Sequence, residues 1–171
     1  GLPAAWPAEP QAGAAVARII MLAGEVQAGR RGLKIGDSVA EGEEITSGRV
    51  SYATFEFTDG SVVCIRPDSR LRIEAHRAPA TLAEFQTRLR LSSGALEATV
   101  PRRRAPKFAI VSLAGNIAVR GTDFRVRGAD EAMLVEVLEG TVEVTGTAGA
   151  GGLVRVHAGY GTQVKPIDAP L

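Results

Sequence analysis

The sequence contains a single cysteine, Cys64, among 171 residues. One cysteine excludes an internal disulfide and any metal site built from several thiolates. Long apolar runs are also missing: the run from Ile19 to Ala23 has five residues, whereas a membrane-spanning helix needs roughly 20. No membrane span is therefore expected in this chain, and aromatic residues, at 5% of the composition, leave aliphatic side chains to form most of the core.

Lysine is scarce, because arginine supplies all but three of the 20 basic residues. The basic residues are unevenly placed: residues 66–127 hold 13 of them against 5 acidic residues, while residues 1–65 and 128–171 are both net acidic. The formal net charge is only +1, which does not favour nucleic acid as a partner. With 45% hydrophobic and 23% charged residues, the chain is expected to fold as one globular unit.

Alternation of apolar and polar residues is the dominant local pattern. In the segment 52–57 the odd positions are apolar, and the run 61–65 follows after Asp59 and Gly60. An Asp-Gly pair between two such runs predicts a β-hairpin in which both turn residues adopt positive φ.

The same pattern recurs along the chain, with a glycine-bearing turn after nearly every run, at residues 70–74, 88–91, 135–137, 142–144 and 153–156. This spacing predicts an all-β fold of short antiparallel strands, arranged as a solenoid-like roll or a two-sheet sandwich. A capping-box pattern at Thr81–Glu84 allows at most one short helix. We expect a flexible arm over residues 1–15, a β domain over 16–165 and a tail over 166–171.

The arginines of the middle third include three pairs at i, i+2 spacing within strand-like runs. They are Arg70 and Arg72, Arg88 and Arg90, and Arg125 and Arg127. Residues at this spacing share one face of a strand, so neighbouring strands would gather six guanidinium groups on one surface. Two interpretations remain open: ordinary solvated faces, or a docking face for an anionic partner, since guanidinium groups bind carboxylates and phosphates well.

Other candidate groups give no pattern that indicates catalysis. His76 and His157 lie in separate strand-like segments without an acidic residue at ligand spacing, and Cys64 is expected to be a small buried filler. The acidic set Asp37, Glu41, Glu43 and Glu44 lacks the alternate spacing of a calcium loop. No metal or other cofactor is expected.

The segment AVRGTDF places an arginine, a glycine, a threonine and an aspartate between apolar residues. Its residues of interest are Val119, Arg120, Gly121, Thr122, Asp123 and Phe124. We interpret it as scaffold: Val119 and Phe124 point inward, and Gly121 permits a bulge or bend. The Thr122 hydroxyl and the Asp123 carboxylate would bond nearby amides, and Arg120 would pair with Asp123 or a neighbouring turn. Catalysis is disfavoured because no nucleophile-base pair is visible.

A series of motifs in fixed order resembles a known family. The motifs are Gly24–Val26, Leu33–Asp37, Gly42–Gly48, Ala53–Ser61 with its Asp59-Gly60 pair, Leu91–Leu96, Val119–Phe124, Val135–Val144 and Ala158–Gly159. Together they are similar to the FecR domain, the periplasmic portion of ferric-citrate-type transmembrane signalling regulators and of many other exported bacterial proteins.

This resemblance implies a non-catalytic periplasmic, or otherwise exported, domain that senses or transmits a signal through protein contact. Its partner would be an envelope protein. An alternative is a binding module for an anionic envelope glycan or other polymer, which would bind through the arginine face. A third hypothesis, an enzyme acting on cell-wall material, would require His76 or His157 to lie beside an acid in a cleft.

Overall fold

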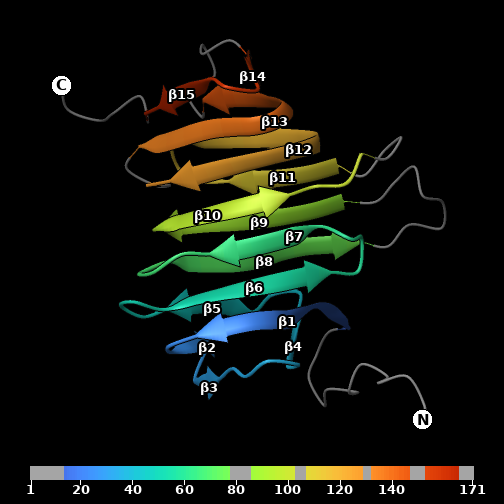
Figure 1. Cartoon of the computed structure of the whole chain (residues 1–171), viewed down its shortest axis with the longest axis vertical. Helices are drawn as coiled ribbons and strands as arrows, with labels where there is room; N and C mark the ends of the chain where they lie inside the picture. The colour runs from blue at the N-terminus through green and yellow to red at the C-terminus, as the bar shows by residue number, and fades with distance from the viewer. Residues whose placement is uncertain (1–13, 78–85, 103–106, 129–131, 147–152, 166–171) are drawn as a thin grey trace.

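The computed structural model describes residues 14–77, 86–102, 107–128, 132–146 and 153–165, and these form fifteen β-strands and no helix (Figure 1). The first eight are β1 (Ala15–Ala23), β2 (Val26–Ala28), β3 (Arg31–Gly32), β4 (Ser38–Ala40), β5 (Glu44–Ser47), β6 (Tyr52–Phe57), β7 (Val62–Ile65) and β8 (Arg70–Arg77). The others are β9 (Gln86–Ser93), β10 (Ala95–Thr99), β11 (Lys107–Val111), β12 (Gly115–Arg127), β13 (Met133–Gly146), β14 (Val154–His157) and β15 (Gly161–Val164).

All fifteen strands belong to one hydrogen-bonded sheet that curls on itself like half of a barrel. Its rear run is β3-β2-β5-β8-β9-β11, and its front run is β10-β7-β6-β1-β4; Figure 1 shows β10 in front of β9. The long strand β12 joins the two runs, because residues 116–119 pair with β11 and residues 123–127 pair with β10. Strand β13 follows β12 along its length and carries β14 and β15.

The core lies in the concavity of this curled sheet and is built from every second residue of its strands. Phe55 of β6, Leu89 of β9 and Ile117 of β12 are fully buried. The rings of Phe108 on β11 and Phe124 on β12 meet edge to face, with centroids 6.4 Å apart. Burying each such side chain contributes about 1.5–3 kcal/mol, so alternation in sequence becomes a continuous apolar interior.

The all-β prediction is confirmed, with differences in strand length and direction. Strands β12 and β13 are 13 and 14 residues long, because each one crosses from one run to the other without ending. Strands β9 and β11 pair in parallel, since the chain leaves β9 for β10 in the front run before it returns to the rear run. The choice between roll and sandwich stays a prediction, the Thr81–Glu84 helix lies outside the described residues, and the domain limits remain expectations.

The predicted hairpin at Asp59 and Gly60 is present, since β6 and β7 pair antiparallel on either side of it. Only Gly60 has positive φ, at 86°, so the expectation that both turn residues adopt this conformation was wrong for Asp59. The reason is that the loop has three residues: Gly60 N donates to Phe57 O and Phe57 N donates to Ser61 O. A type I turn followed by a glycine needs only one left-handed residue.

Candidate functional site

The six arginines of the proposed docking face do not share one surface. Arg70, Arg72, Arg88 and Arg90 lie on β8 and β9 of the rear run. Arg125 and Arg127 lie on the half of β12 that pairs with β10 of the front run. Because the core separates these two runs, the sets face outward on different sides of the molecule. Spacing alone identified which residues share a strand face, but the path of β12 decided where that face points.

Three of the four arginines of the rear run lie beside carboxylates on adjacent strands. Glu44 of β5 lies 3.7 Å from Arg70 and 3.4 Å from Arg72. Glu74 of β8 lies 2.7 Å from Arg90. Exposed pairs of this kind contribute about 0–1 kcal/mol. Glu44 serves both Arg70 and Arg72, so two carboxylates face four arginines and two positive charges remain on this face. The pairing of three of the four arginines supports the interpretation of the rear face as a solvated surface.

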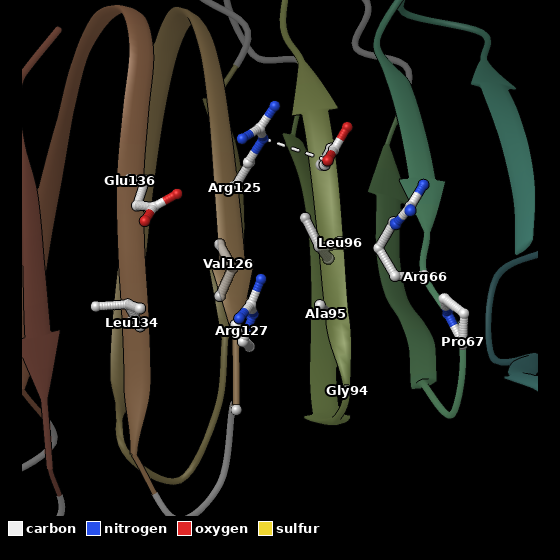
Figure 2. Close-up of a pocket in the computed structure, with 12 residues that line it drawn as sticks. Arg66, Pro67, Gly94, Ala95, Leu96, Arg125, Val126, Arg127, Leu134 and Glu136 are labelled. Atoms are coloured by element: carbon white, nitrogen blue, oxygen red, sulfur yellow. Dashed lines mark ion pairs between the residues drawn. The ribbon is translucent and has the colours of Figure 1, made fainter. Parts of the chain in front are cut away.

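The outer face of β10, β12 and β13 carries an open groove of about 570 Å³ (Figure 2). Its lining comes from the end of β7, from β10, from β12 and from β13, and comprises Arg66, Pro67, Gly94, Ala95, Leu96, Glu97, Arg125, Val126, Arg127, Gly128, Leu134 and Glu136. Leu96 and Val126 point into the core, where they are fully buried. The floor is therefore backbone and the small side chain of Ala95, and the walls are charged.

Hydrogen bonds among residues 47, 66–69, 94–95 and 128, which together we call the stacked corner, hold the lower end of this groove. Arg66 N donates to Ala95 O at 2.9 Å, and Gly128 N donates to Gly94 O at 2.8 Å. The Ser47 hydroxyl donates to Arg66 O at 2.6 Å. These bonds fix the backbone position of Arg66. They also link the groove to Ser47 at the end of β5 and to Gly128 after β12.

The hydroxyl of Ser69 is a further link in that corner that sequence reasoning missed. Ala95 N donates to Ser69 Oγ at 3.0 Å, and Ser69 N donates to Ser47 Oγ at 3.0 Å. The available signal was the turn sequence from Pro67 to Ser69, because serine hydroxyls commonly satisfy backbone groups in turns. Nothing local indicated that its partner would be Ala95, 26 positions away.

A second corner is formed by the segment from Val119 to Phe124, at the place where β12 passes from the rear run to the front run. Val119 and Phe124 are buried, and the β12–β13 register shifts between them, as expected for a bulge. Gly121 has φ 57°. Thr122 N donates to Val100 O at 3.0 Å, and the Thr122 hydroxyl donates to Thr141 O at 2.9 Å, a carbonyl where an amide partner was expected.

Asp123 does not show its expected role within the described residues, because its carboxylate accepts no hydrogen bond there. Its pairing with Arg120 stays a prediction, since the Arg120 side chain is outside the described part. Gly140 on the neighbouring strand β13 also belongs to this corner, because it lies against the Gly121 carbonyl. The segment thus bends the sheet, which supports its interpretation as scaffold.

The sequence comparison decides the family. The profile described as "FecR protein" matches residues 43–143, which include β5, the Asp59-Gly60 hairpin, the groove and both corners. The chain belongs to the FecR family. No curated protein sequence matches it.

Solved structures share the fold of this FecR domain. Two crystal structures of a candidate anti-sigma factor from Parabacteroides distasonis superimpose on it with TM-scores of 0.60 and 0.59 and 21% sequence identity. Each covers 74% of this chain, whereas this chain spans only 56% and 57% of theirs. At this identity the likeness establishes the common fold.

The structure places two of the three other candidate side chains of the FecR domain, those of His157 and Cys64. The ring of His157 is exposed on β14 and lies 3.0 Å from the Thr141 hydroxyl; the His76 side chain is outside the described part. Cys64 is half-buried on the outward face of β7, so its expected burial in the core was wrong: Val63 and Ile65 take the inward positions. The pattern Val-Val-Cys-Ile is apolar on both faces, which hid the direction.

Among the acidic candidates, three carboxylates hold turns or pair with arginine. Glu43 accepts a hydrogen bond from Ala40 N at 2.8 Å and pairs with Arg31 at 2.9 Å. Asp37 accepts one from Lys34 N at 2.9 Å, and Glu44 pairs with arginines of β8. The described residues gather no trio of His, Cys, Asp or Glu side chains suited to a metal ion, and they include no apolar helix of membrane-spanning length.

Proposed function

We propose that this chain is a non-catalytic signalling domain of the bacterial envelope, exported to the periplasm, which receives or transmits a signal by contact with an envelope protein. Membership of the FecR family supports the signalling role. The likeness to a protein described as a candidate anti-sigma factor agrees with it.

The observation that carries the proposal is the form of this groove. The groove is open, it crosses the three neighbouring strands β10, β12 and β13, and its floor is backbone. Small-molecule and catalytic sites are enclosed and combine an apolar lining with a few converging polar groups. An open sheet surface with charged walls instead suits a polypeptide segment, which contributes both side chains and backbone to a contact.

Binding of an anionic envelope polymer is the less favoured alternative. A long polyanion needs a continuous basic track, and the arginines are divided between the outer faces of two runs. Four of the six predicted arginines also have a carboxylate within 4 Å. The same division disfavours nucleic acid, whose affinity depends on neutralising successive phosphates.

A cell-wall enzyme is also less favoured, because the His157 ring contacts a threonine hydroxyl at the surface. General acid-base catalysis requires a group placed against a bound substrate, and His157 lies outside the groove. We therefore expect no turnover of cell-wall material.

Export and signalling can be tested separately in cells. Alkaline phosphatase fused after Leu171 is expected to be active, since that reporter needs the oxidising periplasm to form its disulfides. Activity of a β-galactosidase fusion instead would reject export.

Deleting residues 14–165 from the complete gene product should change the transcription of a restricted gene set. An unchanged transcriptome would reject the signalling role. Hydrolysis of peptidoglycan by the purified chain would reject the non-catalytic role.

A further inference from the structure

The groove on the front run has two ends of opposite charge. At the lower end of the groove, the backbones of Arg66 and Arg127 lie on either side of Ala95, and the Arg66 side chain extends from there toward the level of Leu96 (Figure 2). Arg127 is the direct partner of Ala95 across the β10–β12 ladder, and Arg66 N donates to Ala95 O from the other side. Neither arginine forms an ion pair within the described residues. Two uncompensated guanidinium groups therefore flank a floor that has no charge of its own.

At the upper end of the groove, carboxylates outnumber arginine. Glu97 Oε1 lies 3.2 Å from Arg125 Nε, and Glu136 of β13 is the direct partner of Arg125 across the other ladder. Two carboxylates thus surround one guanidinium group, and the local charge is negative. The lower end carries two positive charges by the same count.

The distance between the two ends follows from the strand itself. Arg127 and Arg125 are two residues apart on β12, which corresponds to about 7 Å along a strand. An extended peptide lying along the groove has the same repeat, so its residues i and i+2 would face the two ends. Beside the basic end, Leu134 is 39% exposed and Pro67 closes the opposite side, which gives the peptide apolar surface to cover.

We propose that this groove binds a short extended segment of a partner protein that carries an acidic residue and a basic residue at i, i+2 spacing. The acidic residue lies over Ala95 between Arg66 and Arg127, where both guanidinium groups donate to its carboxylate. The basic residue lies over the row formed by Glu97, Arg125 and Glu136, in which two carboxylates exceed one guanidinium group. This assignment rests on the proposed function and specifies the partner's chemistry. A polyanion of uniform charge fits less well, because Glu97 and Glu136 repel the negative groups that would follow those bound by Arg66 and Arg127.

The direct test is a titration of the purified chain at low salt with a short fluorescent serine-glycine peptide that contains glutamate and lysine two positions apart, synthesised in both orders. We expect saturable binding of one order in the millimolar range or tighter, with backbone amide NMR shifts centred on Gly94, Ala95 and Arg127. The matched peptide with glutamine in place of glutamate should bind about tenfold more weakly, as expected for the loss of charge-assisted hydrogen bonds.

Matched variants separate the groove from general charge. The variant R66S/R127S should weaken binding about tenfold. The control R30S/R88S removes the same charge from two exposed arginines outside the groove, which also form no ion pair within the described residues, and it should leave binding unchanged. Arg127→Glu should reverse the preference, so that a peptide with lysine in both positions binds better than the glutamate peptide.

Several outcomes would overturn the assignment. They are the absence of binding by either peptide order, equal weakening by the two double variants, and NMR shifts centred on the rear run. Tighter binding of oligogalacturonate that is lost in R66S/R127S would replace the peptide with an anionic glycan. None of these results depends on export or transcription, so a failure of this inference is distinguishable from a failure of the proposed function.

Discussion

Gly140 of β13 packs directly against the carbonyl oxygen of Gly121 of β12: a Cβ atom on Gly140 would lie 2.6 Å from that oxygen. This contact occurs where both long strands bend from the rear run to the front run. A wider separation at this point would open the ladder between β12 and β13, which carries the groove on one side and the core on the other.

Gly140→Ala is therefore expected to destabilise the chain by about 2–4 kcal/mol, through left-handed backbone strain and a backbone clash. Gly159→Ala is the matched control. The two glycines have φ of 85° and 86°, but no atom lies within 4 Å of a Cβ on Gly159, so only the strain of about 1 kcal/mol applies. Urea denaturation measures both changes; equal losses would show that the Gly121 contact is unimportant.

Asp59 is expected to couple the β6–β7 turn to β9. Its buried carboxylate accepts hydrogen bonds from Ser61 N at 2.7 Å and from the Thr87 hydroxyl at 3.1 Å. Asp59→Ala should cost about 1–3 kcal/mol, because the buried Ser61 amide loses its partner. A double-mutant cycle with Thr87→Val should give a coupling free energy of about 1 kcal/mol. Additive effects in that cycle would mean that the Asp59–Thr87 bond contributes nothing.

Ser69→Ala is expected to destabilise the stacked corner below the groove by about 1–3 kcal/mol, since Ala95 N loses its acceptor. Ser93→Ala, one residue before Gly94, serves as the control because its side chain is exposed and makes no hydrogen bond within the described residues. It should change stability by less than about 0.5 kcal/mol. Thermal or urea unfolding distinguishes the two, and similar values would remove the special role of the Ser69 hydroxyl.

The rear-face arginines should contribute little to stability. Arg90→Met should lower the free energy of unfolding by about 0.5–1 kcal/mol at low salt, because the 2.7 Å pair with Glu74 is half-exposed. The effect should shrink as salt is raised. Arg88→Met, on the same strand and without an ion pair among the described residues, should have no measurable effect. A salt-independent loss at Arg90 would point to packing of its side chain instead.

Much of the local structure could be predicted because it depends on neighbouring residues. The alternation in β6 and the glycine of its turn predicted the β6–β7 hairpin, and the bulge at Gly121 followed from a glycine inside an apolar strand pattern. The errors arose where the local pattern allowed more than one outcome. Asp59 does not adopt positive φ because the loop has three residues and needs only Gly60 in the left-handed region. Cys64 faces outward because Val63 and Ile65 fill the core.

The candidate site shows the same division. The sequence showed that the arginines at i, i+2 spacing share a strand face. The order of the motifs along the chain also predicted the FecR family, which the family match confirmed. Which arginines have a carboxylate beside them was not visible. That depended on Glu44 and Glu74 lying beside the rear-face arginines, and on Glu97 lying opposite Arg125.

The sequence by itself determined that this chain is built of β-strands and where most of its turns fall, because side-chain alternation and left-handed glycines act over a few residues. Only the tertiary structure decided that β12 bends between two runs, which places Arg125 and Arg127 away from the other four arginines and beside Arg66. The physical reason is that a surface site is formed by strands adjacent in the sheet, and hydrogen bonding between distant segments sets that adjacency.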